Sequence, residues 1–172
     1  MTKQARRPAS DAEARALAST LRIRILRTCL GEAHTNKEIA DLLHRDPGGT
    51  LHHVRMLVRT GFLMAQPERR GARGAREIPY LATGKSWTLS SPAKHRVLLD
   101  AFLEEVGQVP VDALDTARLG LRLPTRQMDE FLLRMQGLLD EYAALPDDPD
   151  APPMSIFFAV HPDITRAPAR SV

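Results

Sequence analysis

The sequence predicts an α+β protein made of two successive units, a helical domain with a basic β-hairpin and a small strand–helix–strand unit. Three observations support this prediction. Capped segments with helical apolar spacing occupy residues 11–60, and a Gly- and Arg-rich turn separates two extended segments within residues 61–83. Strict alternation of apolar and polar positions in residues 117–123 then indicates a half-buried strand in a second unit.

The first helical segment extends from Asp11 to Leu30, where apolar residues recur at helical spacing. It forms either one long helix or two short helices broken near Ser19, and the sequence leaves both arrangements open. In the next segment, Thr35 and Glu38 have the spacing of a capping box, in which each side chain satisfies an amide at the helix start. We therefore expect a second helix over residues 36–44.

The stretch "DPGGTLHHVRMLVRTGFL" predicts a helix that begins with glycines. Asp46 is a favoured N-cap, and proline suits the first helical position because its missing N–H would have no intrahelical partner. Gly48 and Gly49 then fall in the first turn, where the absent side chains let another molecule approach the backbone closely. The inward face is expected to hold apolar residues and Thr50, and a glycine ends the helix.

The segment "ERRGARGA" separates the extended stretches "GFLMAQP" and "REIPYLAT", a pattern that predicts a β-hairpin with an arginine-rich tip. Residues 85–89 are expected to be extended as well. A helix over residues 92–106 should close the first domain, because its apolar positions again follow helical spacing.

The predicted organisation assigns residues 11–107 to the first domain with its flanking dimerisation helices, and residues 108–163 to a C-terminal regulatory or assembly unit. In the second unit a strand over 117–123 and a strand over 154–160 flank an amphipathic helix over 125–144. The apolar stripe of that helix is expected to be core. We expect residues 1–10 and 164–172 to be disordered tails.

Charge is distributed unevenly along the chain. Residues 1–90 hold 16 Lys and Arg against 8 Asp and Glu, whereas residues 91–172 hold 8 against 13. A basic front half is typical of a module that binds a polyanion. No apolar run approaches the ~20 residues of a membrane span, and the single Cys29 cannot form an internal disulfide, so we expect a cytoplasmic protein.

Two helices joined by a tight turn and followed by a basic hairpin indicate a winged helix-turn-helix domain that binds double-stranded DNA. His52, Arg55 and Arg59 follow an i, i+3, i+7 spacing, which places them on one outward ridge of the second helix. The expected DNA-binding residues of this recognition helix are Gly48, Gly49, Thr50, His52, His53, Arg55 and Arg59. Those of the wing, the hairpin tip, are Arg69, Arg70, Arg73 and Arg76.

The stretches "ALASTLRIRILRTCL", "TNKEIADLL", "TLHHVRMLVRTGFL" and "RRGARGAREIPYLAT" resemble the ArsR family of bacterial winged-helix repressors. The resemblance covers residues 14–89, about half of the chain. It implies a homodimeric repressor whose first helix and post-wing helix form the dimer interface. It also implies an effector, whose identity the sequence does not give, that releases the repressor from operator DNA.

The chain departs from the metal-sensing members of that family. Their Cys-x-Cys pair on the helix before recognition is absent from "EIADLLHRD", and Cys29 lies on a different helix. His52 and His53 diverge by about 100° around a helix, so they do not form a metal-binding pair. We therefore expect no metal site and no cofactor, and we expect Cys29 to be a small buried hydrophobic residue.

No Walker-type loop, nucleophile motif or convincing carboxylate pair indicates an enzyme. Two functions remain. One is a sequence-specific, dimeric transcriptional regulator that acts as a repressor on an inverted-repeat operator. The alternative is a winged-helix protein-interaction module without a specific operator, and the concentration of arginines on the recognition helix and wing favours the regulator.

Overall fold

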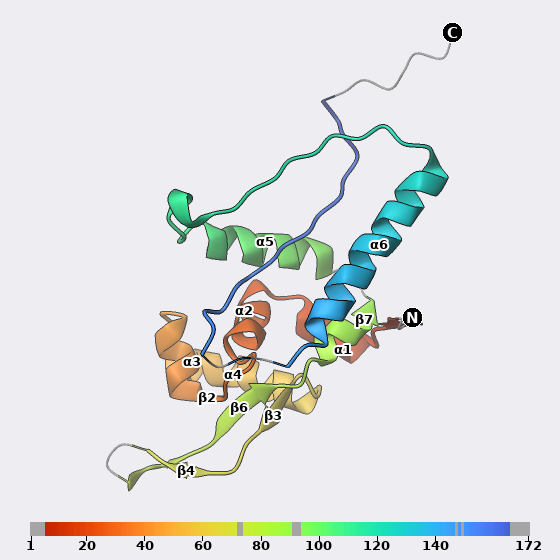
Figure 1. Cartoon of the computed structure of the whole chain (residues 1–172). Helices are drawn as coiled ribbons and strands as arrows, with labels where there is room; N and C mark the ends of the chain where they lie inside the picture. The colour runs from red at the N-terminus through yellow and green to blue at the C-terminus, as the bar shows by residue number, and fades with distance from the viewer. Residues whose placement is uncertain (1–5, 72–73, 91–93, 147, 149, 166–172) are drawn as a thin grey trace. The chain divides into compact units, whose positions relative to one another are not determined.

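The computed structural model divides into two compact units, residues 1–109 and 110–172, and each is described by itself. Among the residues that the structure describes, all of the β-strands belong to the first unit (Figure 1). The residues that the structure describes are 6–71, 74–90, 94–146, 148 and 150–165.

The first unit opens with two short helices, α1 (Asp11–Leu17) and α2 (Thr20–Thr28). The structure thereby selects the second of the two arrangements that the sequence left open. Ser19 ends one helix and caps the next, because its hydroxyl accepts a hydrogen bond from the Arg22 amide at 3.5 Å. Ser10 caps α1 in the same way, with Glu13 completing a capping box that the sequence analysis missed.

The predicted capping box at Thr35 is confirmed. The Thr35 amide donates to Glu38 Oε2 at 2.8 Å, and the Glu38 amide donates to Thr35 Oγ1 at 3.2 Å. A two-residue strand β2 (His34–Thr35) leads directly into helix α3 (Asn36–Leu42), two residues shorter at its C-terminal end than expected. The local pattern therefore defined the helix start more accurately than its end.

Helix α4 (Pro47–Arg59) begins as the sequence predicts, with the Asp46 carboxylate accepting a hydrogen bond from the Gly49 amide at 2.7 Å. The helix terminates at Gly61, whose φ of +73° lies in the left-handed region that favours glycine. The chain then re-enters the core at Phe62 and continues as strand β3 (Leu63–Ala65).

The predicted hairpin is also confirmed. Strand β3 pairs antiparallel with β6 (Pro79–Ala82), and β2 joins the other edge of β6 to give the order β2-β6-β3. Beyond this sheet, β4 (Arg69–Arg70) and β5 (Arg76–Glu77) continue the same ribbon outward (Figure 1). Two helices joined by a tight turn and followed by this ribbon form a winged helix-turn-helix fold.

After the hairpin the structure differs from the expected extended segment. Residues Lys85–Thr88 form a 3₁₀ turn, η2, and only Leu89–Ser90 form a strand, β7. Gly84 starts the turn with a φ of +72°, and the Thr88 hydroxyl closes it by donating to the Lys85 carbonyl at 2.9 Å. Helix α5 (Lys94–Val106) follows; the predicted helix start at residue 92 lies outside the described residues.

The prediction that residues 1–10 form a disordered tail is wrong for residues 6–10, while residues 1–5 lie outside the described part. Strand β1 (Arg7–Pro8) pairs in parallel with β7. Arg6 lies over the Trp87 ring at 4.6 Å from its centroid, and the Arg7 guanidinium binds the Glu13 carboxylate. The residues that bind this segment are 6 to more than 80 positions away from it in the sequence. No local pattern within the tail therefore indicated that it is ordered.

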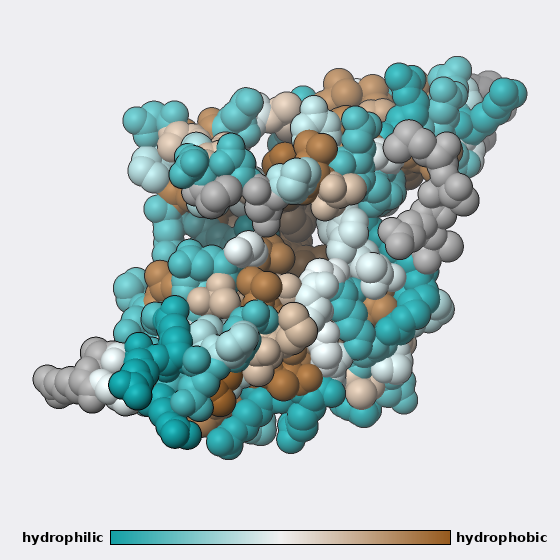
Figure 2. Space-filling view, turned by 60° about the horizontal axis from the view of Figure 1, so that its bottom comes forward, coloured by the Kyte–Doolittle hydropathy of each residue, from teal (hydrophilic) through white to brown (hydrophobic). Residues whose placement is uncertain are grey.

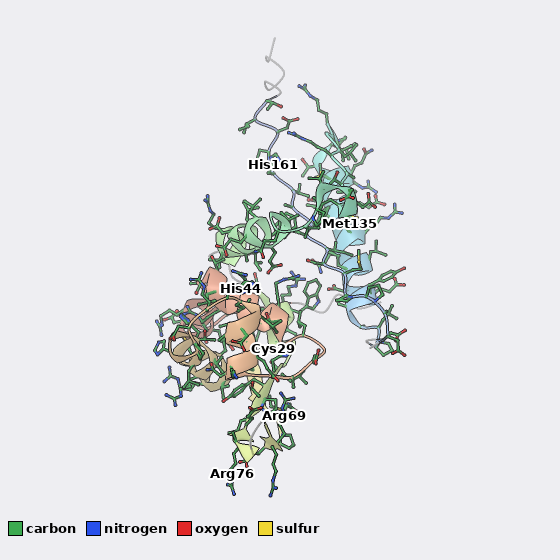
Figure 3. The ribbon with its side chains drawn as sticks, turned by 90° about the vertical axis from the view of Figure 1, so that its left-hand side faces the viewer. Cys29, His44, Arg69, Arg76, Met135 and His161 are labelled. Atoms are coloured by element: carbon green, nitrogen blue, oxygen red, sulfur yellow. The ribbon has the colours of Figure 1, made fainter. Side chains whose placement is uncertain are left out.

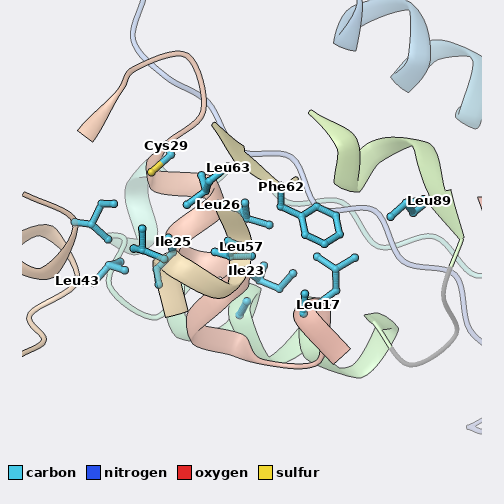
Figure 4. Packing of buried hydrophobic residues seen from close by; sticks show 14 residues of the cluster. Leu17, Ile23, Ile25, Leu26, Cys29, Leu43, Leu57, Phe62, Leu63 and Leu89 are labelled. Carbon is cyan, nitrogen blue, oxygen red and sulfur yellow. The ribbon is translucent and has the colours of Figure 1, made fainter. Parts of the chain in front are cut away.

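The first unit has one hydrophobic core, which collects residues from every helix of the unit and from the sheet. Phe62 is its largest fully buried side chain and lies close to Leu17, while Cys29 lies beside Leu26 and Leu63 (Figure 4). Leucine, isoleucine and valine supply most of the remaining contacts, as the low aromatic content implied. This core holds the inner faces of α2, α3 and α4 together.

The second unit contains a 3₁₀ turn, η3 (Val111–Ala113), and the 19-residue helix α6 (Thr125–Ala143), which matches the predicted helix. The two predicted flanking strands are wrong: residues 117–123 and 154–160 are all described and form no strand. Alternation alone does not make a strand, because a strand also needs a partner for its backbone hydrogen bonds. Of the predicted C-terminal tail, residues 166–172 lie outside the described part.

A charged cluster around Glu13 joins three segments of the first unit. The Glu13 carboxylate, 7% exposed, accepts from both Arg7 Nη atoms at 2.6 and 2.8 Å and from the Ser10 amide at 2.8 Å. Lys85 Nζ lies 2.8 Å from the same carboxylate and also donates to the Thr60 carbonyl at 2.6 Å. The hydrogen bonds from Arg7 and Lys85 and the amide of Ser10 hold the pKa of Glu13 far below its ordinary value.

We predict that Glu13→Gln destabilises the protein at neutral pH and flattens the acid side of its stability profile. Because folding lowers the pKa of Glu13, the ionised carboxylate contributes stability above its unfolded pKa of about 4.3, and that contribution is lost as the pH falls further. Urea unfolding between pH 7 and pH 3 measures the difference. If the stabilities of the two proteins differed by a constant amount over this range, the role assigned to the carboxylate would be wrong.

Candidate nucleic-acid interface

Helix α4 presents two different faces. Val54, Leu57 and Thr50 are buried, and the Thr50 hydroxyl donates to the Asp46 carbonyl at 2.8 Å. The inward face is therefore the one that the helical spacing predicted. The Thr50 side chain, however, is only 1% exposed, so it does not reach an outer surface, contrary to its assignment as a DNA-contacting residue.

The opposite face of α4 carries the predicted polar ridge. His52, Arg55 and Arg59 are all exposed. Within the described part of the chain, neither arginine forms a hydrogen bond or an ion pair. Two guanidinium groups one helical turn apart are therefore free to bind an external acceptor, and a carboxylate, a phosphate or a guanine edge would fit their donor geometry.

His53 does not belong to this ridge. Its Nδ1 lies 3.3 Å from Arg22 Nη1, and because a guanidinium can only donate, Nδ1 is the acceptor. Arg22 also donates to the carbonyls of Ala16 at 2.5 Å and Arg15 at 2.7 Å, at the C-terminal end of α1. The half-buried His53 thus links α4 to α1 and α2, and a contact between His53 and DNA stays a prediction.

The pKa of His53 is lowered from its ordinary value, first by burial, then by the nearby Arg22 guanidinium and the His52 ring. The neutral ring is the form that can accept the hydrogen bond from Arg22. The rings of His52 and His53 make an edge-to-face contact, with their centroids 5.8 Å apart and an angle of 82° between the ring planes.

The two glycines at the start of α4 are exposed, as predicted. A Cβ on Gly48 would lie 3.0 Å from the Asp46 carboxylate, whereas a Cβ on Gly49 would make only an ordinary contact with that oxygen at 3.6 Å. The fold of the free protein therefore has no steric need for a glycine at position 49. The small residue keeps the outer surface of the first turn open to close approach.

The wing consists of β4, β5 and the turn between them, and Figure 3 shows Arg76 toward its outer end and Arg69 closer to the body of the unit. Arg69 forms ion pairs with Glu38 on α3 and, at 3.8 Å, with Glu77 on β5. Arg76 pairs with Glu68 at 3.3 Å. Of the four predicted wing cations, these two are thus matched with carboxylates.

The other two predicted wing cations are Arg70 and Arg73. Arg70 is exposed and has no ion-pair partner in the described part of the wing, while Arg73 lies outside the described residues. The pair between Arg69 and Glu38 joins the wing to the helix-turn-helix, so Arg69 orients the wing. The exposed pair of Arg76 contributes little stability, and a phosphate could replace its carboxylate at small cost.

The structure adds cations that the sequence analysis did not assign. Arg45 is exposed in the turn between α3 and α4, directly before the N-cap of α4, and Lys37 is exposed on the first turn of α3. Their position next to the tight turn of the helix pair was the available signal. The surface around the wing end of the unit is accordingly strongly hydrophilic (Figure 2).

Neither metal nor thiol chemistry has a site among the described residues. They contain no group of three or more His, Cys, Asp and Glu side chains that could hold a metal ion. Cys29 is buried, and burial raises the pKa of its thiol to about 12. A thiol with such a pKa stays protonated near neutral pH and is a poor nucleophile and metal ligand.

Comparison with known proteins gives little further information. No protein-family model and no curated protein matches the chain. One matching solved structure is the transcriptional regulator SlyA, with 19% identity over 71% of this chain and 75% of that chain, and a TM-score of 0.33. That likeness is too low to carry an argument, so the winged-helix description rests on the element order given above. No helix of the described part is long and apolar enough to cross a membrane.

We predict that Gly49→Ala raises the free energy of unfolding by about 0.5–1 kcal/mol. The new methyl group has room, and alanine loses less backbone entropy than glycine on entering a helix. Chemical denaturation measures the change, with Gly61→Ala as a control that should destabilise because its φ is positive. A loss of stability at position 49 would show that the glycine serves the fold.

Proposed function

We propose that the chain is a sequence-specific DNA-binding transcriptional regulator of the ArsR type, acting as a homodimeric repressor on an inverted-repeat operator. The observation that carries this proposal is the free pair Arg55 and Arg59 on the outer face of a helix whose inner face is locked into the core. Unpaired cations on a rigid element are suited to an external polyanion, since no internal carboxylate has to be displaced first.

Major-groove geometry supports α4 as the recognition helix. The groove admits an α-helix, and an arginine can bind the O6 and N7 atoms of guanine with two hydrogen bonds. Arg55 lies one turn closer than Arg59 to the N-terminal end of the helix, the end that usually meets base edges, and His52 lies closer still. We therefore assign base reading to Arg55 and His52, and backbone contacts to Arg59 and Arg45.

The wing supports the same proposal in a different role. Arg70 is the described wing cation without a carboxylate partner, and we assign it to a phosphate or to a narrow minor groove. Arg69, held by Glu38, would keep the wing at a fixed angle to α3. The recognition helix would then supply specificity and the wing would supply affinity.

The proposed dimer uses α5, the helix after the wing. One face of α5 packs on α2, where Arg24 pairs with Glu104 at 3.2 Å and Arg27 with Glu105 at 2.7 Å. Leu99 and Leu103 lie one turn apart and are exposed. Joining α5 and α1 of two chains would cover these leucines and set two recognition helices about 34 Å apart, one turn of B-DNA.

Arg55→Ala should remove discrimination of about 1–3 kcal/mol at one base pair of the operator, because the guanidinium would be a bidentate base contact. Arg70→Ala should instead weaken binding to all duplexes and lower the salt slope by about one, because one phosphate contact is lost. Selection of sites from a random duplex pool, followed by titration at several salt concentrations, measures both effects.

Arg118→Ala provides the control for both arginine substitutions. Arg118 is an exposed arginine of the second unit and belongs neither to α4, nor to the wing, nor to α5, so its loss should change neither specificity nor the salt slope. Unchanged operator binding in both the Arg55 and the Arg70 variants would refute these residue assignments. Absence of any duplex binding by the wild type would favour a protein-docking module instead.

Leu103→Glu should weaken self-association at micromolar concentration, because a charge placed in an apolar interface must be desolvated without a partner. Leu30→Glu is a matched control, since the two leucines are 55% and 56% exposed and only Leu103 lies on α5. Light scattering and sedimentation measure the mass. Dimers of equal stability in both variants would place the interface elsewhere.

A further inference from the structure

The described residues of the second unit include no buried side chain, and no residue of α6 joins the hydrophobic core cluster. Large apolar side chains are nevertheless abundant on it. Those exposed to solvent are Val111, Leu119, Leu123, Leu132, Leu133, Leu138, Tyr142, Leu145, Met154, Ile156, Phe158, Val160 and Ile164. An apolar surface of this extent on a small unit marks an interaction site.

Helix α6 gives this surface a regular pattern. Met128, Phe131, Met135, Leu138 and Tyr142 follow one another at intervals of three, four, three and four residues, which is the a/d repeat of a coiled coil. The Phe131 ring contacts Phe158 at a centroid separation of 6.4 Å, so the stripe is partly covered within the unit. Leu138 and Tyr142 remain 48% and 64% exposed. The uncovered part of the stripe lies toward the C-terminal end of the helix.

We propose that α6 pairs antiparallel with α6 of a second copy of the chain. In antiparallel coiled coils, a positions of one helix face d positions of the other. One register then matches every apolar layer. Phe131 lies opposite the partner's Tyr142, and Met135 lies opposite the partner's Leu138. Met128 lies opposite the partner's Leu145, which is two residues beyond the end of the helix.

The charges beside the stripe select this register. Arg134 and Glu141 both occupy g positions, which face each other across an antiparallel pair. In the register that matches the apolar layers, Arg134 lies opposite the partner's Glu141, and symmetry repeats this pair on the other side. On the e side, Leu132 lies opposite the partner's Leu139. A parallel pair would instead set Arg134 against the partner's Leu139, with no opposite charge.

Arg134 and Glu141 cannot form an ion pair with each other within one helix. Arg134 and Glu141 are seven residues apart, so they are separated by about 10 Å along the helix axis, beyond the reach of an i, i+4 pair. Both are exposed, and neither forms an ion pair with a described residue. Their complementarity is therefore realised between chains.

The contact is short, since α6 is about 28 Å long. Isolated helix pairs of this length are marginal in water, so the contact operates in the full chain, where the exposed apolar segments on either side of α6 add to the covered surface. The pairing is separate from the leucines of α5. It also does not depend on DNA binding, because no residue of α4 or of the wing takes part.

Charge reversal in the full-length protein tests the proposal. Arg134→Glu and Glu141→Arg should each raise the dissociation constant for self-association about fivefold, a change of about 1 kcal/mol, because two attractive pairs become repulsive. The double variant should return to within about twofold of wild type, because the pairs are restored in reversed order. Sedimentation equilibrium measures all three constants.

Arg126→Glu is the matched control for this experiment. It makes the same charge change on the same helix at an f position, away from the partner, and should leave the dissociation constant unchanged. A double variant as weak as the single variants would overturn the proposal, as would a wild-type chain that remains monomeric. DNA affinity is not the readout, so failure of the regulator proposal would be distinguishable from failure of this one.

Cross-linking tests the register directly. A mixture of the Arg134→Cys and Glu141→Cys variants, treated with a short bis-maleimide, should form cross-linked dimers in far higher yield than a mixture of the Arg126→Cys and Glu141→Cys variants. Cys29 can stay in place, because it is buried and does not compete for the reagent. Equal yields from the two mixtures would contradict antiparallel pairing.

Discussion

The arrangement of the first unit depends on the carboxylate of Glu13. Four donors converge on it, two from Arg7, one from the Ser10 amide and one from Lys85. The same Lys85 ammonium donates to the Thr60 carbonyl, where α4 ends, and lies 5.1 Å from the centre of the Phe62 ring. One buried carboxylate thereby connects the N-terminal arm, α1, the segment after the wing and the end of α4. Removal of a partner from such a cluster leaves buried charge uncompensated, which is why a cluster of this kind fixes geometry.

Helix α4 is consequently held at both ends and along one side. At its start, Asn36 Nδ2 donates to the Pro47 carbonyl at 2.9 Å, and at its end Lys85 binds Thr60. Between these points Val54 and Leu57 anchor it in the core, and His53 receives the guanidinium of Arg22. On the outer face, Arg55 and Arg59 form no hydrogen bond or ion pair with any residue that the structure describes. A rigid helix with free cations on one face meets the requirement for reading a duplex, since little conformational entropy is lost on binding.

The two units differ in how far they bury their apolar side chains. The first buries its leucines and isoleucines against each other, whereas the second exposes most of its apolar side chains. A heptad stripe with complementary g positions accounts for the latter, because its partner is another copy of the same helix. Self-association would thus arise from two separate surfaces, one in each unit, and symmetric assembly suits a protein proposed to bind an inverted repeat.

The sequence by itself determined those features whose causes lie within a few residues. The capping box of Thr35 and Glu38, the Asp46 N-cap with its following proline, the turn at Gly61 and the period of α6 all depend on neighbours along the chain. The tertiary structure alone decided which polar groups remain free. Arg69 pairs with Glu38 and His53 pairs with Arg22, and the members of each pair are 31 residues apart in the sequence. The sequence placed Arg69 and His53 among the candidate DNA contacts, and it could not indicate the internal partners that orient them. Residues 117–123 form no strand for a related reason. Alternation of apolar and polar residues specifies which side chains share a face, but a strand also needs a neighbouring strand for its backbone hydrogen bonds.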